Sequence, residues 1–369
     1  MARFSSGHAL LQLTGSLGMT VGTALLQIHS GQTWKEQLQD AIRTPAELAM
    51  AVGLSLEDLP YSKEADDSFS LLVPRAFATR IKKGDSKDPL LLQVLAADQE
   101  TQSVEGFSDD PVAETSLYAD TPGIIRKYHG RALLVATGQC AVNCRYCFRR
   151  AYPYADNAQS SNERLAAIDQ LLEDRSIGEL ILSGGDPLLL TDSNIAAIAE
   201  RLRRSDRQIT LRIHTRLPIV IPDRVTDQLM DALRPQEQPV VMVVHSNHPA
   251  EIDPSTAQAL RRLRDGGIIV LNQSVILRGV NDDAEVLGQL SDRLFSAGTM
   301  PYYIHMLDRV SGSAHFEVDE SQARKILGQL AATRPGYLVP KLAVEVPGAS
   351  SKREIAPDYL EQLSVSVPD

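Results

Sequence analysis

Short apolar runs alternate with longer amphipathic stretches along the chain from about residue 131 onward. The stretches between the runs, such as 162–174, 222–234 and 282–298, repeat their apolar residues with helical spacing. Continuous apolar runs that alternate with helices are typical of parallel strands joined by crossover helices. The pattern therefore predicts an α/β fold. Six runs have strand character: 132–137, 179–182, 208–213, 240–245, 268–273 and 300–306.

The chain before this region has helical rather than strand-like patterning. Thr33 with Glu36, and Thr44 with Glu47, have the spacing of capping boxes, in which two residues satisfy each other's backbone N–H groups at a helix start. A further apolar run at 337–346 leads into a Pro-, Gly- and Ser-rich end. We expect four regions: a disordered tail at 1–24, a helical part at 25–110, a βα region at 111–335 and a C-terminal segment at 336–369. Met19 is an alternative start, because recognisable organisation begins only after it.

Each predicted strand is followed at once by a polar cluster. In order, these are GQCAVNCRYC, SGGDP, HTR, HSNHP, NQS and LDR. In a barrel of βα units the C-terminal ends of all strands open onto one mouth, where working residues gather. Six units instead of eight predict a partial (β/α)6 TIM-type barrel that stays open on one side, with the helical part added at the N-terminus.

Composition narrows the functional classes. The 369 residues carry a net charge of -10, which argues against binding along a nucleic-acid backbone or an anionic membrane. No apolar run reaches the roughly 18 to 20 residues that span a bilayer. The only three cysteines are clustered, which argues against a disulfide framework and favours the reducing cytoplasm.

The three cysteines, Cys140, Cys144 and Cys147, form a C-x3-C-x2-C motif. A cubane 4Fe-4S cluster that only carries electrons uses four thiolate ligands. Three ligands leave one iron open to bind and activate a small molecule. The alternatives are a structural zinc site, which usually has four ligands and C-x2-C pairs, and three buried thiols.

A C-x3-C-x2-C motif after the first strand of a partial barrel resembles the radical S-adenosylmethionine (SAM) superfamily. In that superfamily the open iron chelates SAM, which is cleaved to a radical that abstracts hydrogen. The glycine-rich stretch after the second strand is similar to the superfamily motif that receives the SAM amino group; its residues here are Ser183, Gly184, Gly185 and Asp186. A GGD sequence alone would be read as a turn.

Longer stretches narrow this resemblance to the lysine 2,3-aminomutase family. They are KYHGRALLVATGQCAVNCRYCFRR, SGGDPL, HSNHPAEID, LNQSVILRGVND and YYIHMLDRVSGSAHF, and the similarity extends from about residue 25 to about 355. Within the family, the chain most resembles the short bacterial enzymes that make (R)-β-lysine for modifying elongation factor P. The resemblance implies an isomerase that uses a 4Fe-4S cluster, SAM and pyridoxal 5′-phosphate (PLP) on L-lysine. It also implies an external electron donor of the flavodoxin or ferredoxin type, a functional link to elongation factor P and its lysyl-transferring ligase, and a homo-oligomer.

The resemblance also assigns roles to individual residues of this sequence. Lys352 matches the lysine that carries PLP, and Lys127 and Arg131 match the contacts to the PLP phosphate. Arg149 matches the contact to the substrate carboxylate, and Asp308 and Glu345 match the acids that hold the substrate ε-ammonium. His245 and Gln273 match positions near SAM. Lys127 replaces a family arginine, so a point charge stands where a bidentate fork is usual. Taken singly, these residues have ordinary alternatives. Lys352 could be a solvated lysine, with Lys341 as the rival PLP lysine. Asp308 and Glu345 could be surface or salt-bridge carboxylates, and Arg149 could only neutralise the charge of the cluster. His245 and His248 could be core histidines or a metal pair.

Two departures concern the active site. Glu345 stands where longer family members have Asp, and His305 stands where they often have Tyr. With no cysteine left after Cys147, we expect none of the structural zinc of the longer enzymes. Three other functions stay open: an aminomutase that makes free β-lysine for catabolism or osmoprotection, a radical SAM activase of another protein, and an iron–sulfur electron carrier.

Overall fold

The computed structural model describes residues 31–114, 123–126, 128–154, 159–235 and 238–359. Within these residues the strands form one sheet in the order β1 to β9. Its strands are β1 (Ile124–Ile125), β2 (Arg131–Thr137), β3 (Glu179–Gly184), β4 (Thr210–Thr215), β5 (Val240–His245), β6 (Ile269–Val275), β7 (Met300–His305), β8 (Lys341–Val344) and β9 (Arg353–Glu354). All neighbours from β2 to β8 are parallel, and β1 and β9 pair antiparallel at the two edges. Since β1 and β9 do not pair with each other in the described residues, the sheet stays open.

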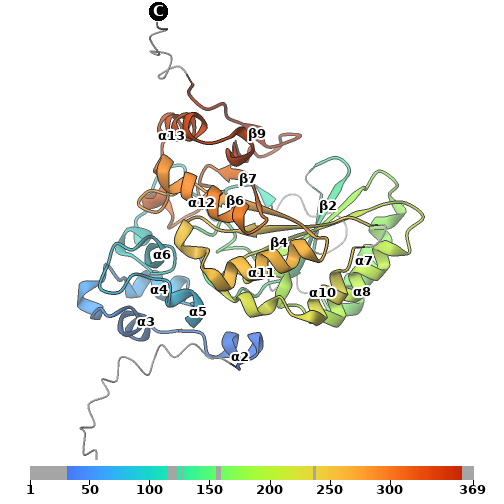
Figure 1. Cartoon of the computed structure of the whole chain (residues 1–369), viewed down its shortest axis with the longest axis horizontal. Helices are drawn as coiled ribbons and strands as arrows, with labels where there is room; N and C mark the ends of the chain where they lie inside the picture. The colour runs from blue at the N-terminus through green and yellow to red at the C-terminus, as the bar shows by residue number, and fades with distance from the viewer. Residues whose placement is uncertain (1–30, 115–122, 127, 155–158, 236–237, 360–369) are drawn as a thin grey trace, which may run out of the picture.

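A helix follows each of the six strands from β2 to β7, and these helices lie along one side of the sheet (Figure 1). They are α7 (Ser161–Glu173), α8 (Asp192–Arg203), α10 (Asp227–Leu233), α11 (Pro254–Asp265), α12 (Ala284–Ser296) and α13 (Glu320–Thr333). The six predicted strands are all present, with bounds that differ from the prediction by at most two residues. The partial barrel is therefore confirmed, and the apolar run at 337–346 adds β8 as a seventh parallel strand.

Five short helices precede the sheet and pack at one end of it (Figure 1). They are α2 (Trp34–Gln39), α3 (Pro45–Val52), α4 (Lys63–Ser68), α5 (Arg75–Ala78) and α6 (Pro89–Leu92). Thr33 and Glu36 form the expected capping box at α2. At α3 the prediction is half wrong: Thr44 accepts from the Glu47 N–H, but the Glu47 carboxylate pairs with Arg75. Glu47 therefore ties α3 to α5 instead of closing the cap.

Short one-turn segments fill the connections. They are η1 (Leu56–Asp58), η2 (Asp98–Thr101), η5 (Pro187–Leu189), α9 (Leu217–Val220), η6 (Pro222–Arg224), η7 (Pro249–Glu251), η8 (Ala314–Phe316) and η9 (Gly336–Leu338). One apolar core runs from Trp34 and Leu90 in the N-terminal helices to Leu180 and Leu263 in the barrel. The N-terminal helices therefore share the barrel's core. No helix in the described part of the chain is long and apolar enough to cross a membrane. The expected tail at 1–24 lies outside the described residues.

Candidate active site

The cysteine motif occupies an irregular loop directly after β2. The three thiols are free and partly buried, and the Cys147 N–H donates to the Cys144 carbonyl oxygen over 3.0 Å. The residues on either side of Cys144 are hydrogen-bonded to the N-terminal part of the chain. The Asn143 N–H donates to Leu72 O over 3.0 Å, and the Arg145 N–H donates to Gln93 O over 2.9 Å. The helices before the sheet therefore fix the backbone of a loop that has no regular structure of its own.

A buried ion cluster holds the same loop from within. Arg145 is completely buried, and its Nε and Nη2 donate to the two oxygens of Glu100 over 2.8 and 2.6 Å. Arg150 approaches the same carboxylate at 2.9 Å. Removing one partner of such a group leaves an uncompensated buried charge, which costs several kcal/mol. The thiols are thus presented by a loop whose position depends on Glu100.

The thiols are chemically suited to a multi-iron cluster. Burial raises the pKa of Cys140 well above its usual value and that of Cys147 to about 11, with a further rise from the neighbouring thiols. No three His, Cys, Asp or Glu side chains of the described residues are placed to hold a single metal ion. A cubane cluster instead takes one thiolate at each iron, and bound iron deprotonates its thiols. Three free thiols on one fixed loop fit a 4Fe-4S cluster with one open iron.

The SGGDP stretch packs directly on the cysteine loop. The Gly185 N–H donates to Thr137 O and the Asp186 N–H to Gln139 O, both over 2.7 Å. A Cβ at Gly185 would lie 2.1 Å from Gln139 O, and one at Gly184, whose φ is +113°, would lie 2.6 Å from Thr137 O. Both glycines are therefore required by the close approach of the two loops.

The Asp186 side chain has a structural task. Its carboxylate accepts from the Thr215 hydroxyl at 2.6 Å and from the N–H groups of Leu188, Arg216 and Leu217 at 2.8 to 3.0 Å. It is 4% exposed, and burial raises its pKa despite these bonds. The carboxylate therefore ties β3 to the turn after β4.

His245 and Gln273 are register partners on β5 and β6, so the two residues expected near SAM are neighbours on one face of the sheet. His245 Nε2 lies 3.1 Å from the Tyr146 hydroxyl of the cysteine motif. Desolvation, followed by the nearby Arg216, lowers the pKa of His245 to about 3. The imidazole is therefore neutral near pH 7.

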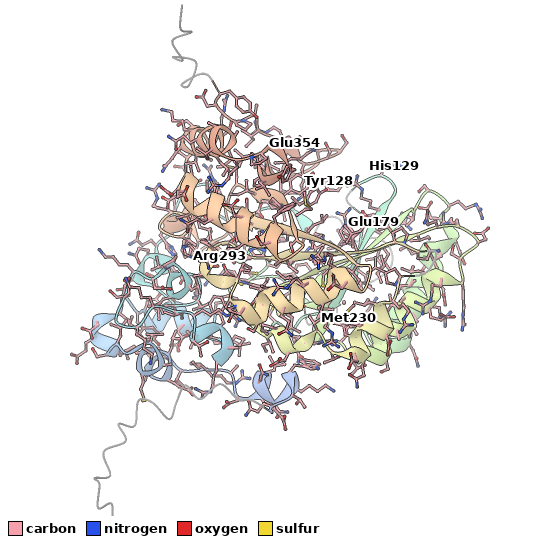
Figure 2. All side chains as sticks on the ribbon, viewed as in Figure 1. Tyr128, His129, Glu179, Met230, Arg293 and Glu354 are labelled. Carbon is pink, nitrogen blue, oxygen red and sulfur yellow. The ribbon has the colours of Figure 1, made fainter. Side chains whose placement is uncertain are left out.

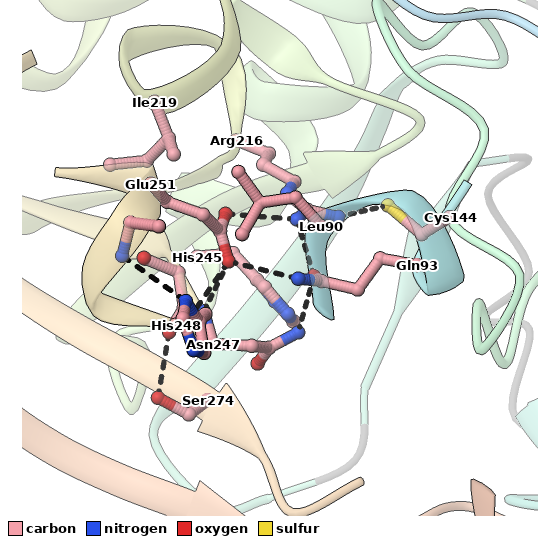
Figure 3. A network of polar contacts seen from close by, with 12 residues as sticks. Leu90, Gln93, Cys144, Arg216, Ile219, His245, Asn247, His248, Glu251 and Ser274 are labelled. Carbon is pink, nitrogen blue, oxygen red and sulfur yellow. Dashed lines mark hydrogen bonds and ion pairs between the residues drawn. The ribbon is translucent and has the colours of Figure 1, made fainter. Parts of the chain in front are cut away.

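Figure 3 shows the polar network beside His245, in which Arg216 pairs with Glu251. His248, the other half of the possible histidine pair, points elsewhere: its Nδ1 accepts from the Ala250 N–H as a cap of η7.

Arg149 lies next to both loops. Its Nη1 donates to the Ser183 hydroxyl over 2.9 Å, while Nε and Nη2 form a bidentate pair with Glu114 at 2.7 and 2.8 Å. Glu114 was not anticipated from the sequence. A guanidinium has five N–H donors. In the described residues three of them are used, so one N–H each on Nη1 and Nη2 remains for a ligand.

Lys352 and Glu345 come together at the opposite end of the sheet. The Lys352 ammonium donates to one oxygen of Glu345, and the Tyr128 hydroxyl donates to the other. The Glu345 side chain is 7% exposed, whereas that of Lys352 is 31% exposed. Tyr128 stands before β2 and Glu354 ends β9, so both lie near the open side of the sheet (Figure 2). Tyr128 is a second residue that sequence patterns did not single out.

Of the remaining predicted residues, Arg131 and His305 have electrostatic contacts with members of this group. Electrostatic contacts place Arg131 near Tyr128, although Arg131 is half exposed and its Nε is 3.8 Å from Glu179. Desolvation and then the Lys352 charge lower the pKa of His305 to about 3. Asp308 is partly buried just after β7, and its carbonyl oxygen accepts from the Val310 N–H at 2.7 Å. Lys127 lies outside the described residues.

His214 links the two halves of the site. It lies on β4, and its pKa is lowered well below the usual value by desolvation and then by Arg212, Lys352, Arg149 and His305. One imidazole is thus within electrostatic reach of both Lys352 and Arg149. The three cysteines, the glycine-rich turn, Arg149, Lys352 and Glu345 consequently border one region, although they are spread over more than 200 residues of sequence. Such an arrangement suits a ligand that is held at both ends.

Comparisons with known proteins show which family the chain resembles. The model of the radical SAM superfamily matches residues 134–290. An L-lysine 2,3-aminomutase from Haemophilus influenzae is 45% identical over 88% of this chain and 96% of its own length, and one from Escherichia coli is 44% identical over 89% and 95%. An L-lysine 2,3-aminomutase from Clostridium subterminale is 31% identical over 89% of this chain and 78% of its own length.

Proposed function

The chain belongs to the L-lysine 2,3-aminomutase family of radical SAM enzymes, and we propose that it converts L-lysine to (R)-β-lysine. When bound, the cluster with SAM supplies a radical that removes a hydrogen atom from C3, and PLP bonded to the α-nitrogen supplies a π-system through which nitrogen can move from C2 to C3. The chain itself must then hold one C–H bond beside the radical and both ends of the substrate in place.

The observation that carries the substrate assignment is the grip of Glu345 on Lys352. Glu345 is buried and already binds an ε-ammonium group, which is the terminal group of free lysine. Lys352 would hold PLP, and while it did so its nitrogen would not be an ammonium group, so Glu345 would be available to the ε-ammonium of an incoming substrate. Asp308 supplies the second acid of this end. Two acids facing one cation select against glutamate, whose side chain would leave both unpaired.

Arg149 binds the other end of the substrate in this proposal. One N–H group on Nη1 and one on Nη2 remain as charged donors, which suits a carboxylate. Glu114 holds the fork from behind and fixes its plane. The proposal also gives the phosphate of PLP to Arg131 and Lys127, and the SAM amino group to the backbone of 183–185, with His245 and Gln273 beside SAM.

We propose further that the product serves the β-lysylation of elongation factor P through a lysyl-transferring ligase. Support comes from the resemblance of the chain to the short bacterial members of the family; the chain covers 96% and 95% of the Haemophilus influenzae and Escherichia coli relatives and 78% of the Clostridium subterminale relative. When purified elongation factor P is incubated with its ligase and the enzyme's product, elongation factor P should gain the mass of one lysyl unit. Faster transfer of L-α-lysine than of the product would instead favour a role in making free β-lysine.

The catalytic proposal is tested by an anaerobic assay of reconstituted protein with L-lysine, SAM, PLP and a low-potential reductant, followed by chiral chromatography. We expect (R)-β-lysine, no product from Cys144→Ala, and loss of the PLP absorption band in Lys352→Ala. Turnover by Cys144→Ala would contradict the radical chemistry. Cleavage of SAM without β-lysine would leave the cluster assignment standing and contradict the substrate assignment.

A further inference from the structure

Arg216 reaches a cysteine of the cluster site from the end of β4. Its Nη1 donates to Cys144 Sγ and to the Tyr146 hydroxyl, both over 2.7 Å (Figure 3). The side chain is 7% exposed. A guanidinium keeps its charge at every physiological pH. A fixed positive charge therefore lies against one ligand sulfur, and the function proposed above gives it no task.

A buried network prevents Arg216 from turning away. Nη2 donates to Gln93 Oε1 at 2.7 Å and to Glu251 Oε2 at 2.9 Å. Glu251 is fully buried, and its other oxygen accepts from the backbone N–H groups of Asn247 at 2.9 Å and His248 at 3.0 Å. The carboxylate is thus held independently of Arg216. Its negative charge stands behind the guanidinium, on the far side from the sulfur.

We propose that Arg216 and Glu251 set the reduction potential of the cluster, with Arg216 raising it and Glu251 lowering it. Reduction adds one electron from the external donor to the cluster, and no bond to the protein changes. Hydrogen bonds to ligand sulfurs and nearby positive charge stabilise the more negative, reduced cluster. Glu251 opposes this effect, since it offsets part of the guanidinium charge. The inference rests on the cluster of the proposed function.

The test is a potentiometric titration of the full-length reconstituted protein without SAM, followed by electron paramagnetic resonance. Arg216→Gln should shift the reduction equilibrium about tenfold toward the oxidised cluster, which for one electron is about 59 mV more negative. Glu251→Gln should move the midpoint in the opposite direction, because Arg216 then keeps its full charge. Mere loosening of the loop would move both variants in the same direction.

Arg224→Gln is the matched control. Arg224 is also a fully buried arginine, but it donates to Leu188 O at 2.7 Å and pairs with Asp192 at 2.8 Å. Among the described residues, none of its contacts is a thiol. The midpoint potential of the cluster in Arg224→Gln should equal that in the wild type.

Three results would overturn the inference: an unshifted Arg216→Gln, shifts of the same sign in Arg216→Gln and Glu251→Gln, or an equal shift in the control. If Arg216→Gln assembles no cluster, Glu251→Gln decides, and an unchanged or more negative midpoint overturns the proposal. A wild-type protein that takes up no cluster would overturn the proposed function as well, whereas a cluster with unshifted potentials would overturn this inference alone.

Discussion

Replacing Glu345 with Gln tests how the site recognises the far end of its substrate. The carboxylate is buried, contacts the Lys352 ammonium and accepts from Tyr128. Glutamine has the same shape and still accepts one hydrogen bond, but it has no charge. The substitution therefore removes the attraction for an ε-ammonium and leaves the space occupied by the side chain nearly unchanged.

The expected magnitude follows from the strength of a charged hydrogen bond. Such bonds contribute about 1.5–3 kcal/mol, and each 1.4 kcal/mol is a factor of ten. The value of kcat/KM for L-lysine should therefore fall by about 10- to 150-fold. Norleucine, which has a hydrogen atom in place of the ammonium group, gains nothing from the charge. The kcat/KM for norleucine should differ by less than about threefold between Glu345→Gln and the wild type. Where norleucine turns over too slowly, its inhibition constant against lysine should change by less than the same factor.

The assay compares both ligands in anaerobic kinetics of the wild type, Glu345→Gln and Glu354→Gln. Glu354 is the matched control, because it is a glutamate of the same C-terminal segment that is half exposed and pairs with Lys341. It should retain wild-type kinetics. Equal losses for lysine and norleucine in Glu345→Gln would refute the role of Glu345 in binding the ammonium group and would indicate a general disturbance of the site.

Further predictions concern the loops and the pH dependence. Gly185→Ala should prevent cluster uptake, measured as iron per chain, because the new methyl group would overlap the cysteine loop; Gly178→Ala, which has open space, should not. Glu100→Gln should lower the free energy of unfolding in urea by about 3–5 kcal/mol, whereas Asp67→Asn at an exposed pair should change it by less than about 0.5. Burial lowers the pKa of His305 to about 3, so between about pH 6.5 and 3 this imidazole binds a proton in the unfolded protein but not in the folded protein. The free energy of unfolding should therefore fall as the pH drops through this range, and it should fall less steeply in His305→Asn.

The strands could be predicted because most of them contain a short apolar run. Strands β2 and β5 carry five consecutive apolar residues each, whereas Arg212 interrupts β4 and burial alternates along β4 and β6. The same feature located the polar clusters that border the site. The edge strands β1 and β9 have two residues each and left no pattern to detect. Their pairing depends on the neighbouring strand rather than on their own sequence.

The partners of the predicted charges were beyond sequence reasoning. Glu114 lies 35 positions from Arg149, and Tyr128 lies 217 positions from Glu345. Each is one of many similar side chains, and only the fold selects it. Arg216 stood in a noted cluster, HTR, but nothing in three letters indicates that its fork reaches Cys144. Spacing could predict the ligands of a cluster but not the residues that surround them.

The most direct test of the aminomutase assignment follows a hydrogen atom. Reconstituted protein would be incubated with SAM, PLP, a reductant and L-lysine carrying deuterium at C3, and the β-lysine and the recovered SAM would be analysed by mass spectrometry and NMR. The account predicts deuterium at C2 of β-lysine and at the 5′ carbon of SAM, because the hydrogen removed from C3 is held by the adenosyl group before it returns. β-Lysine without deuterium at C2, or SAM cleavage that leaves lysine unchanged, would contradict it.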